Sequence, residues 1–101
     1  MSIIVHIYYT GKDGSAKKFA QEMIESGIVN DIRAEEGNLK YDYYFPIGNE
    51  ETILLIDKWT NQEALDKHHK SEMMTKIADL RTKYKLKMRV ERYVFNDNKN
   101  L

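Results

Sequence analysis

Apolar and polar positions follow two different periods along the chain, and each period predicts one type of element. Residues 3–9 are β-branched or aromatic almost throughout, which is typical of a strand. Strands are also predicted over residues 39–45, 52–59 and 86–95. Between them, residues 15–36 and 60–84 carry apolar side chains at helical spacing. The predicted order is therefore β-α-β-β-α-β.

Local signals predict where the helical regions begin, break and end. Ser15 follows a glycine-rich turn and is a candidate N-cap, and Thr60 to Glu63 has the T-x-x-E form of a capping box. Gly27 lies on the apolar stripe of the first region, so we expect a kink or a break there. Gly37 is the expected C-terminal stop of that region. The segment 70–72 interrupts the second region.

The strands differ in how many of their faces are apolar. Residues 53–56 are apolar on both faces, so we expect both faces to be covered. The strands predicted over residues 39–45 and 86–95 instead carry apolar side chains at alternating positions, on one face each. The residues on the apolar faces are Leu39, Tyr41, Tyr43 and Phe45 in one strand, and Leu86, Met88, Val90 and Val94 in the last.

This order of elements predicts an α+β fold of the ferredoxin-like, split βαβ type. Right-handed crossovers place both helical regions on one face of a four-stranded antiparallel sheet. The other face is left uncovered, and apolar surfaces of that size usually mark an interface. We therefore expect residues 1–101 to form a single domain, with a frayed tail over 96–101, and to assemble as a homodimer through the sheet face.

Composition excludes several classes of protein. The 101 residues contain no cysteine, and 16 basic residues balance 16 acidic ones, so a nucleic-acid partner is not expected. No apolar run approaches the length of a membrane span, and the N-terminus lacks a signal-peptide layout. We expect a cytoplasmic protein with no membrane partner. Metal-ligand spacings and nucleotide-binding glycine motifs are also missing from the sequence, so neither a metal nor a cofactor is predicted.

Three short motifs, in this order, resemble the antibiotic biosynthesis monooxygenase family of small dimeric α+β barrels. Glu35 to Tyr41 has the form E-x-G-x-x-x-Y, Asp57-Lys58-Trp59 is an acidic-x-Trp, and Ala64 to His68 is A-x-x-x-H. The resemblance extends over about residues 3–93. It implies the same fold and dimer. It also implies one of several activities, among them cofactor-independent oxygenation of phenolic or quinol substrates and isomerisation of a phosphorylated sugar.

His68 is the candidate catalytic residue. It lies one helical turn after Ala64, so its ring should point toward the sheet, where an imidazole could accept a phenolic proton. The alternative is a buried structural histidine, and the family pattern makes the two about equally probable. Trp59, Tyr41 and Tyr43 are candidates to line a pocket for a flat aromatic substrate, although aromatic packing of a small core explains them equally well.

Three further residues complete the candidate substrate-binding set. Asn38 could bind a substrate carbonyl or form a turn, and His6 faces either the pocket or the dimer interface. Met73 follows the interruption of the second helical region and is assigned to the same pocket. His69 should be exposed. A run of basic residues over 81–92 is interpreted as a solvated surface, unless it lines the pocket and so favours an anionic substrate.

The resulting hypothesis is an enzyme, a cofactor-independent monooxygenase that acts with O2 on a small aromatic or quinol-like molecule. One alternative is an isomerase of a small phosphorylated carbonyl compound on the same fold. Another is a non-catalytic dimeric ligand-binding or stress protein, which a filled core beneath His68 would favour.

Overall fold

The computed structural model describes residues 1–96. The predicted order of elements is confirmed, and each helical region is split in two. The strands are Ser2–Thr10 (β1), Asn38–Tyr44 (β2), Thr52–Trp59 (β3) and Lys87–Phe95 (β4). The helices are Ser15–Glu25 (α1), Ile28–Arg33 (α2), Gln62–His69 (α3) and Met73–Lys83 (α4). The breaks fall at Gly27 and over residues 70–72, as the sequence predicts.

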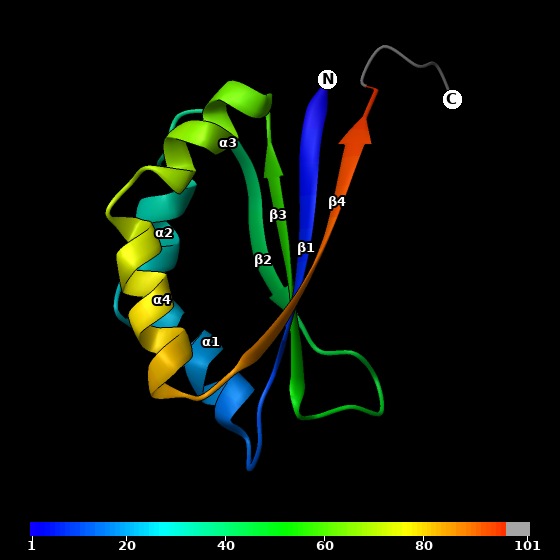
Figure 1. Ribbon diagram of the computed structural model, residues 1–101, viewed down its shortest axis with the longest axis vertical. Coiled ribbons are helices and arrows are strands. Elements are labelled where there is room, and N and C mark those ends of the chain that lie inside the picture. The colour runs from blue at the N-terminus through cyan, green and yellow to red at the C-terminus, as the bar shows by residue number, and fades with distance from the viewer. Residues whose placement is uncertain (97–101) are drawn as a thin grey trace.

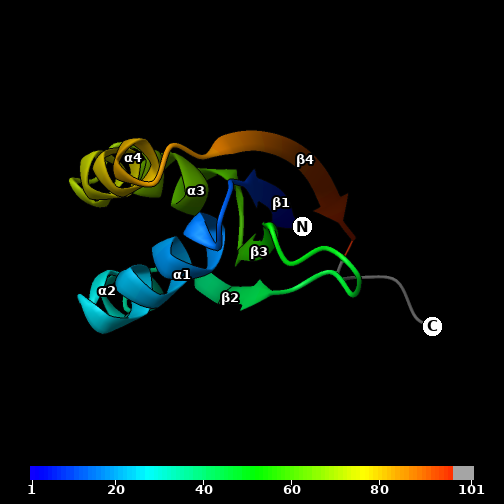
Figure 2. The ribbon, with the colours of Figure 1, turned by 90° about the horizontal axis from the view of Figure 1, so that it is seen from below.

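The four strands form one antiparallel sheet in the order β2-β3-β1-β4. All four helices lie on one side of it, as Figure 1 shows from one direction and Figure 2 from below. This is the predicted α+β, ferredoxin-like fold. Among the described residues, no helix has the length and apolar character needed to cross a membrane. Residues 97–101, which make up most of the predicted frayed tail, lie outside the described part of the chain.

Strand alternation determines which side chains enter the core between the sheet and the helices. Residues that pair directly across the sheet share a face, so Tyr41, Asp57 and Val5 lie in one row on the helix side. Helices α1, α2, α3 and α4 contribute the opposing apolar side chains. The largest fully buried side chains of the core are Trp59, Tyr9, Tyr41, Phe19, Met23 and Ile32.

The other face of the sheet is not covered by any described residue. Leu54 and Ile56 are half-buried there, whereas their neighbours Ile53 and Leu55 are almost completely buried against the helices. Strand β4 curves away from the helix layer in Figure 2 and is exposed along nearly its whole length. Its exposed apolar residues are Met88, Val90, Tyr93, Val94 and Phe95. These apolar residues are therefore exposed within one chain.

Both predicted helix caps are displaced by one residue. Gly14, not Ser15, is the N-cap of α1, because a left-handed φ of 79° places it just outside the helix. Asn61, not Thr60, caps α3, and its side chain accepts a hydrogen bond from the backbone N–H of Ala64 at 2.9 Å. Asparagine is at least as good an N-cap as threonine. The backbone N–H of Thr60 instead donates to the carbonyl of Gly37.

Two expectations for the segment around β2 are also wrong. Helix α2 ends at Arg33, before the predicted stop at Gly37, and a turn fills the interval. Leu39 and Phe45 are exposed and do not share the buried face of Tyr41. The pairing of β2 with β3 shifts register between Asn38 and Lys40, and such an irregularity displaces Leu39 from the regular alternation. Phe45 lies beyond the end of β2.

Candidate functional site

His68 is buried in the last turn of α3, with 3% of its surface exposed. Its Nδ1 lies 2.9 Å from Oε2 of Glu35, which belongs to the turn after α2. A carboxylate can only accept, so Nδ1 carries the hydrogen and Nε2 is left as the basic nitrogen of the neutral ring. Burial lowers the pKa of His68, and the hydrogen bond and charge of Glu35 oppose that effect without cancelling it. The imidazole is therefore neutral near pH 7.

The ring of Trp59 stacks on His68, with 4.7 Å between the ring centroids and an angle of 25° between the planes. Trp59 is completely buried at the end of β3, and its Nε1–H donates to Oδ1 of Asp57 at 2.5 Å. Burial raises the pKa of Asp57 to about 7, and the charge of Glu35 adds to that increase, whereas the Trp59 hydrogen bond opposes it. Asp57 thus fixes the indole that packs against the imidazole.

Gly37 allows the turn that carries Glu35 to lie against the start of α3. Its φ is +85°, and a Cβ at this position would lie 2.5 Å from Cβ of Ala64 and 2.7 Å from Oγ1 of Thr60. The carbonyl of Gly37 accepts a hydrogen bond from the backbone N–H of Thr60 at 2.8 Å. A side chain at position 37 would push the turn outward, and Glu35 would move with it.

Two tyrosines of β2 extend the site along the helix side of the sheet. Tyr41 pairs directly with Asp57, and its ring meets that of Tyr43 edge-on at 5.9 Å. Burial raises the pKa of both phenols, so both stay protonated. The hydroxyl of Tyr43 is buried with no hydrogen-bond partner among the described residues. It is a donor and acceptor available to a polar group that enters the core.

Asn38 and Met73, which are also predicted site residues, belong to the strand pair and to the core cluster that contain Trp59. Asn38 pairs with Trp59 across the strands, and its Nδ2 donates to the carbonyls of Lys40 and Lys58 at 3.3 and 3.5 Å, so the side chain is engaged by the backbone. Met73 is buried in the core cluster that also contains Trp59.

Two histidines are not part of the buried group. His6 lies on the uncovered face of the sheet, because it pairs with Ile56 and not with the helix-side residues. Its ring meets Tyr93 of β4 at 5.1 Å, so the structure does not bring it to His68. His69 is exposed, as predicted, and its ring centroid lies 5.8 Å from that of His68.

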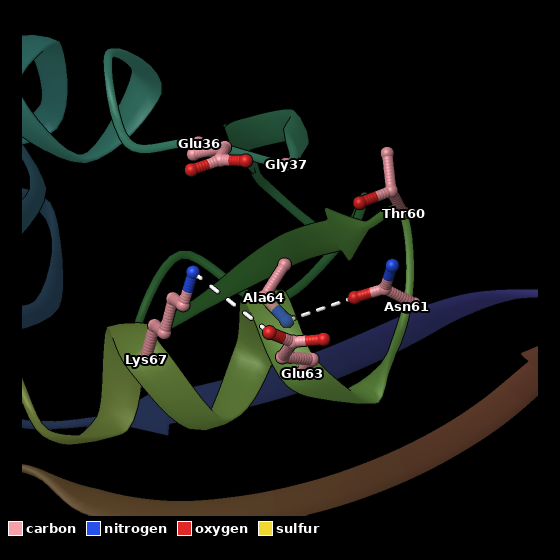
Figure 3. A pocket seen from close by; sticks show the side chains of 7 residues that line it. All are labelled: Glu36, Gly37, Thr60, Asn61, Glu63, Ala64 and Lys67. Carbon is pink, nitrogen blue, oxygen red and sulfur yellow. Dashed lines mark hydrogen bonds and ion pairs between the residues drawn. The ribbon is translucent and has the colours of Figure 1, made fainter.

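A small cavity of about 100 Å³ adjoins the buried group (Figure 3). It lies between the turn after α2 and the start of α3. Its lining includes Glu36, which follows Glu35 in the chain, and Thr60, which follows Trp59. Ala64, one turn before His68, also contributes to it. None of the four cavities described for residues 1–96 has His68 itself in its lining. With 3% of its surface exposed, His68 is enclosed by protein atoms.

The arrangement can perform proton transfer. It combines a neutral imidazole oriented by a carboxylate, a second carboxyl group that titrates near neutral pH, and two protonated phenols. No group of three or more potential metal ligands occurs within residues 1–96, so the described side chains offer no metal centre.

Glu35 and Asp57 are the two members of the site that are not among the predicted site residues. Both lie within motifs that the sequence contains, Glu35 at the start of E-x-G-x-x-x-Y and Asp57 in the acidic-x-Trp. An acidic residue placed two positions from an inward-facing tryptophan on a strand shares its face, and that alternation is the signal for Asp57. Glu35 has no comparable local signal.

Comparisons with known proteins identify relatives of this chain. Residues 2–80 match the sequence model of the family described as "Antibiotic biosynthesis monooxygenase". The chain is 30% identical over 69 residues to the "Putative monooxygenase YcnE" of Bacillus subtilis (strain 168), a match that covers 68% of this chain and 70% of that protein.

Two solved structures have the same fold. The crystal structure of "a putative antibiotic biosynthesis monooxygenase" from Deinococcus radiodurans superimposes with a TM-score of 0.83 at 19% identity, covering 98% of this chain and 97% of that one. SnoaB from Streptomyces nogalater, "a cofactor-independent oxygenase", superimposes with a TM-score of 0.77 at 9% identity, over 96% and 95% of the two chains. On the strength of the family match, this chain belongs to the antibiotic biosynthesis monooxygenase family.

Proposed function

We propose that this protein is a cofactor-independent monooxygenase of a small aromatic, quinol-like substrate, with His68 as its general base. Membership of the family and the similarity to a protein named as a monooxygenase support the reaction class. The single observation that supports the role of His68 is its 2.9 Å contact with Glu35. A neutral imidazole with a carboxylate on Nδ1 is arranged as a base at Nε2.

In the proposed reaction Nε2 of His68 accepts the phenolic proton of the quinol. The resulting phenolate is electron-rich and reacts with O2. One oxygen atom enters the ring, and the other leaves as water, so hydroquinone and O2 give hydroxybenzoquinone and water. Trp59, Tyr41 and Tyr43 would contact the flat ring of the substrate.

The volume of the cavity sets a condition on this proposal. An engineered apolar cavity of ~150 Å³ binds one benzene molecule, whereas the cavity beside Glu36 and Thr60 measures about 100 Å³. A hydroquinone therefore requires side chains around His68 to move. The same packing favours a second candidate function, a dimeric protein whose buried histidine is structural and which catalyses no reaction.

We also propose that a second copy of the chain covers the bare face of the sheet. The exposed apolar residues of β4 on that face, Tyr93 and Phe95, would be buried in that homodimer. Light scattering should then give a mass of twice 12.0 kDa, and Tyr93→Asp, on the same face as His6, should shift it toward 12.0 kDa. A 12.0 kDa species of the unmodified protein at micromolar concentration would exclude the dimer.

The catalytic proposal is tested by oxygen consumption with a panel of hydroquinones. His68→Ala should lower the rate by a factor of ~10²–10⁴, the usual contribution of a general base. His69→Ala is the matched control, because it removes the exposed neighbouring imidazole, and it should leave the rate unchanged. Oxygen consumption that is absent from the unmodified protein, or equal in the two variants, would favour the non-catalytic function.

A further inference from the structure

Five lysines line a hollow of about 730 Å³ at the end of the sheet opposite His68. Three segments far apart in the sequence form it: the turn after β1, the first residues of α1, and the connection from α4 to β4. We call this cavity the lysine hollow. Its lysines are Lys12, Lys18, Lys83, Lys85 and Lys87, and Asp13 is the one acidic residue in its lining.

The charge of the lysine hollow is largely uncompensated. The whole chain has equal numbers of basic and acidic residues, 16 of each, so this five-to-one ratio is a local excess. Lys83 forms an ion pair with Glu22 at 2.7 Å. For the other four lysines, no carboxylate of residues 1–96 lies within ion-pair distance. Like charges that share one hollow repel one another, and a bound anion would relieve that repulsion.

Lys85 occupies a backbone position that favours glycine. Its φ is +53°, and it directly follows Tyr84, the C-cap of α4. The N–H of Lys85 donates to the carbonyl of Thr82, and the N–H of Leu86 donates to that of Arg81, both at 3.1 Å, which is the Schellman pattern. Glycine is the usual residue at this left-handed position. Position 85 thus holds a lysine that lines the hollow, although glycine would relieve the backbone strain at this position.

We propose that the lysine hollow binds a small polyanion that carries two or more phosphate groups. A phosphate group has a charge of about −1.5 to −2 at pH 7, and lysine ammonium groups bind phosphate as point charges. A single carboxylate would neutralise only one of the four unpaired lysines. The volume also lies within the ~300–1,000 Å³ typical of small-molecule sites.

This site is separate from the group around His68. Thr10 pairs with Lys87 at the lysine hollow, whereas Ile3 pairs with Trp59 at the other end of β1. Seven residues of strand separate the two pairs, which corresponds to ~23 Å. Figure 1 shows α3 at one end of the sheet and the beginnings of α1 and β4 at the other. A ligand in the hollow would not touch His68, so the proposal does not depend on the catalytic one.

Isothermal titration calorimetry of the full chain with inorganic triphosphate tests the proposal. We expect triphosphate to bind at least tenfold more tightly than orthophosphate, with an affinity that falls as salt concentration rises. Lys85→Gly should weaken the binding of triphosphate ~3- to 10-fold, the effect of losing one charged contact. The same variant should melt at an equal or higher temperature without ligand, because glycine suits the left-handed position. Weaker binding could then not be attributed to damaged folding.

Two controls make the result specific. Lys76→Ala removes an exposed lysine of α4 outside the hollow and should leave the affinity unchanged. His68→Ala should bind triphosphate as the unmodified protein does, which separates this test from the catalytic one. Equal affinities for triphosphate and orthophosphate, or equal losses in Lys85→Gly and Lys76→Ala, would overturn the proposal. So would affinity for single-stranded oligonucleotides that keeps rising with length, since that identifies a nucleic-acid surface.

Discussion

Of the substitutions considered, Gly37→Ala is the one whose effect on the free energy of unfolding follows most directly from the structure. The alanine would have to keep the left-handed backbone conformation of Gly37, which costs ~1–2 kcal/mol for a residue other than glycine. Its Cβ would also lie 2.5 Å from Cβ of Ala64 and 2.7 Å from Oγ1 of Thr60. Overpacking of this kind typically costs a further ~1–3 kcal/mol. We expect Gly37→Ala to lower the free energy of unfolding by about 2–5 kcal/mol.

Gly27→Ala is the matched control. Gly27 has φ +88°, but a Cβ there would meet no atom within 4 Å, so only the backbone cost of ~1–2 kcal/mol applies. Equilibrium unfolding in urea, followed by the emission of Trp59, gives both free energies, and Trp59 is the single tryptophan of the chain. Gly37→Ala should lose ~1–3 kcal/mol more than Gly27→Ala. Equal losses would refute the inference that Gly37 is needed for the close approach of its turn to α3.

Three further predictions concern individual contacts. Asn61→Ala should lower the free energy of unfolding by about 1 kcal/mol because α3 loses its cap, and Asn61→Asp should restore it in the same urea assay. The pKa of Asp57 is raised from 3.8 to about 7, so the folded protein holds a proton that the unfolded chain releases. Stability gained from Asp57 is therefore complete below pH ~4 and is lost as pH rises through ~7, a change of about 4 kcal/mol. Unfolding measured from pH 4 to 8 should show this loss in the unmodified protein relative to Asp57→Asn, and parallel curves would contradict the burial of a protonated Asp57. Glu35→Gln removes the charge that raises the pKa of His68, so an NMR titration of the imidazole should show that pKa moving further down. An unchanged titration would mean that Glu35 does not contact His68 in solution.

The fold could be predicted from the sequence because each element has a strong local pattern. The strand predicted over residues 52–59, which contains the apolar run 53–56, has the same bounds as β3 in the structure. The breaks at Gly27 and over residues 70–72 could be predicted because the apolar residues at helical spacing are interrupted there in the sequence. The cap of α3 was displaced by one residue because Thr60 and Asn61 are comparable capping residues and only tertiary contacts distinguish them. At Thr60 that contact is the hydrogen bond to Gly37.

The candidate site could be predicted only in part. Helical spacing correctly turned His68 toward the sheet, and Trp59, predicted to line a pocket or pack in the core, is completely buried. The partner of His68 is Glu35, 33 residues earlier, and no local pattern connects two residues at that separation. The position of His6 depends on which face of β1 the helices cover, and alternation alone does not determine that face.

We propose that this chain inserts one atom of O2 into an aromatic substrate without a cofactor. The most direct measurement is a reaction of the purified, metal-free protein with a hydroquinone under ¹⁸O2, followed by mass spectrometry of the product. We predict a hydroxyquinone that carries one ¹⁸O atom, formed by the unmodified protein and by His69→Ala but not by His68→Ala. A product without the label, or a labelled product formed equally by His68→Ala, would rule out the proposed reaction with His68 as its base.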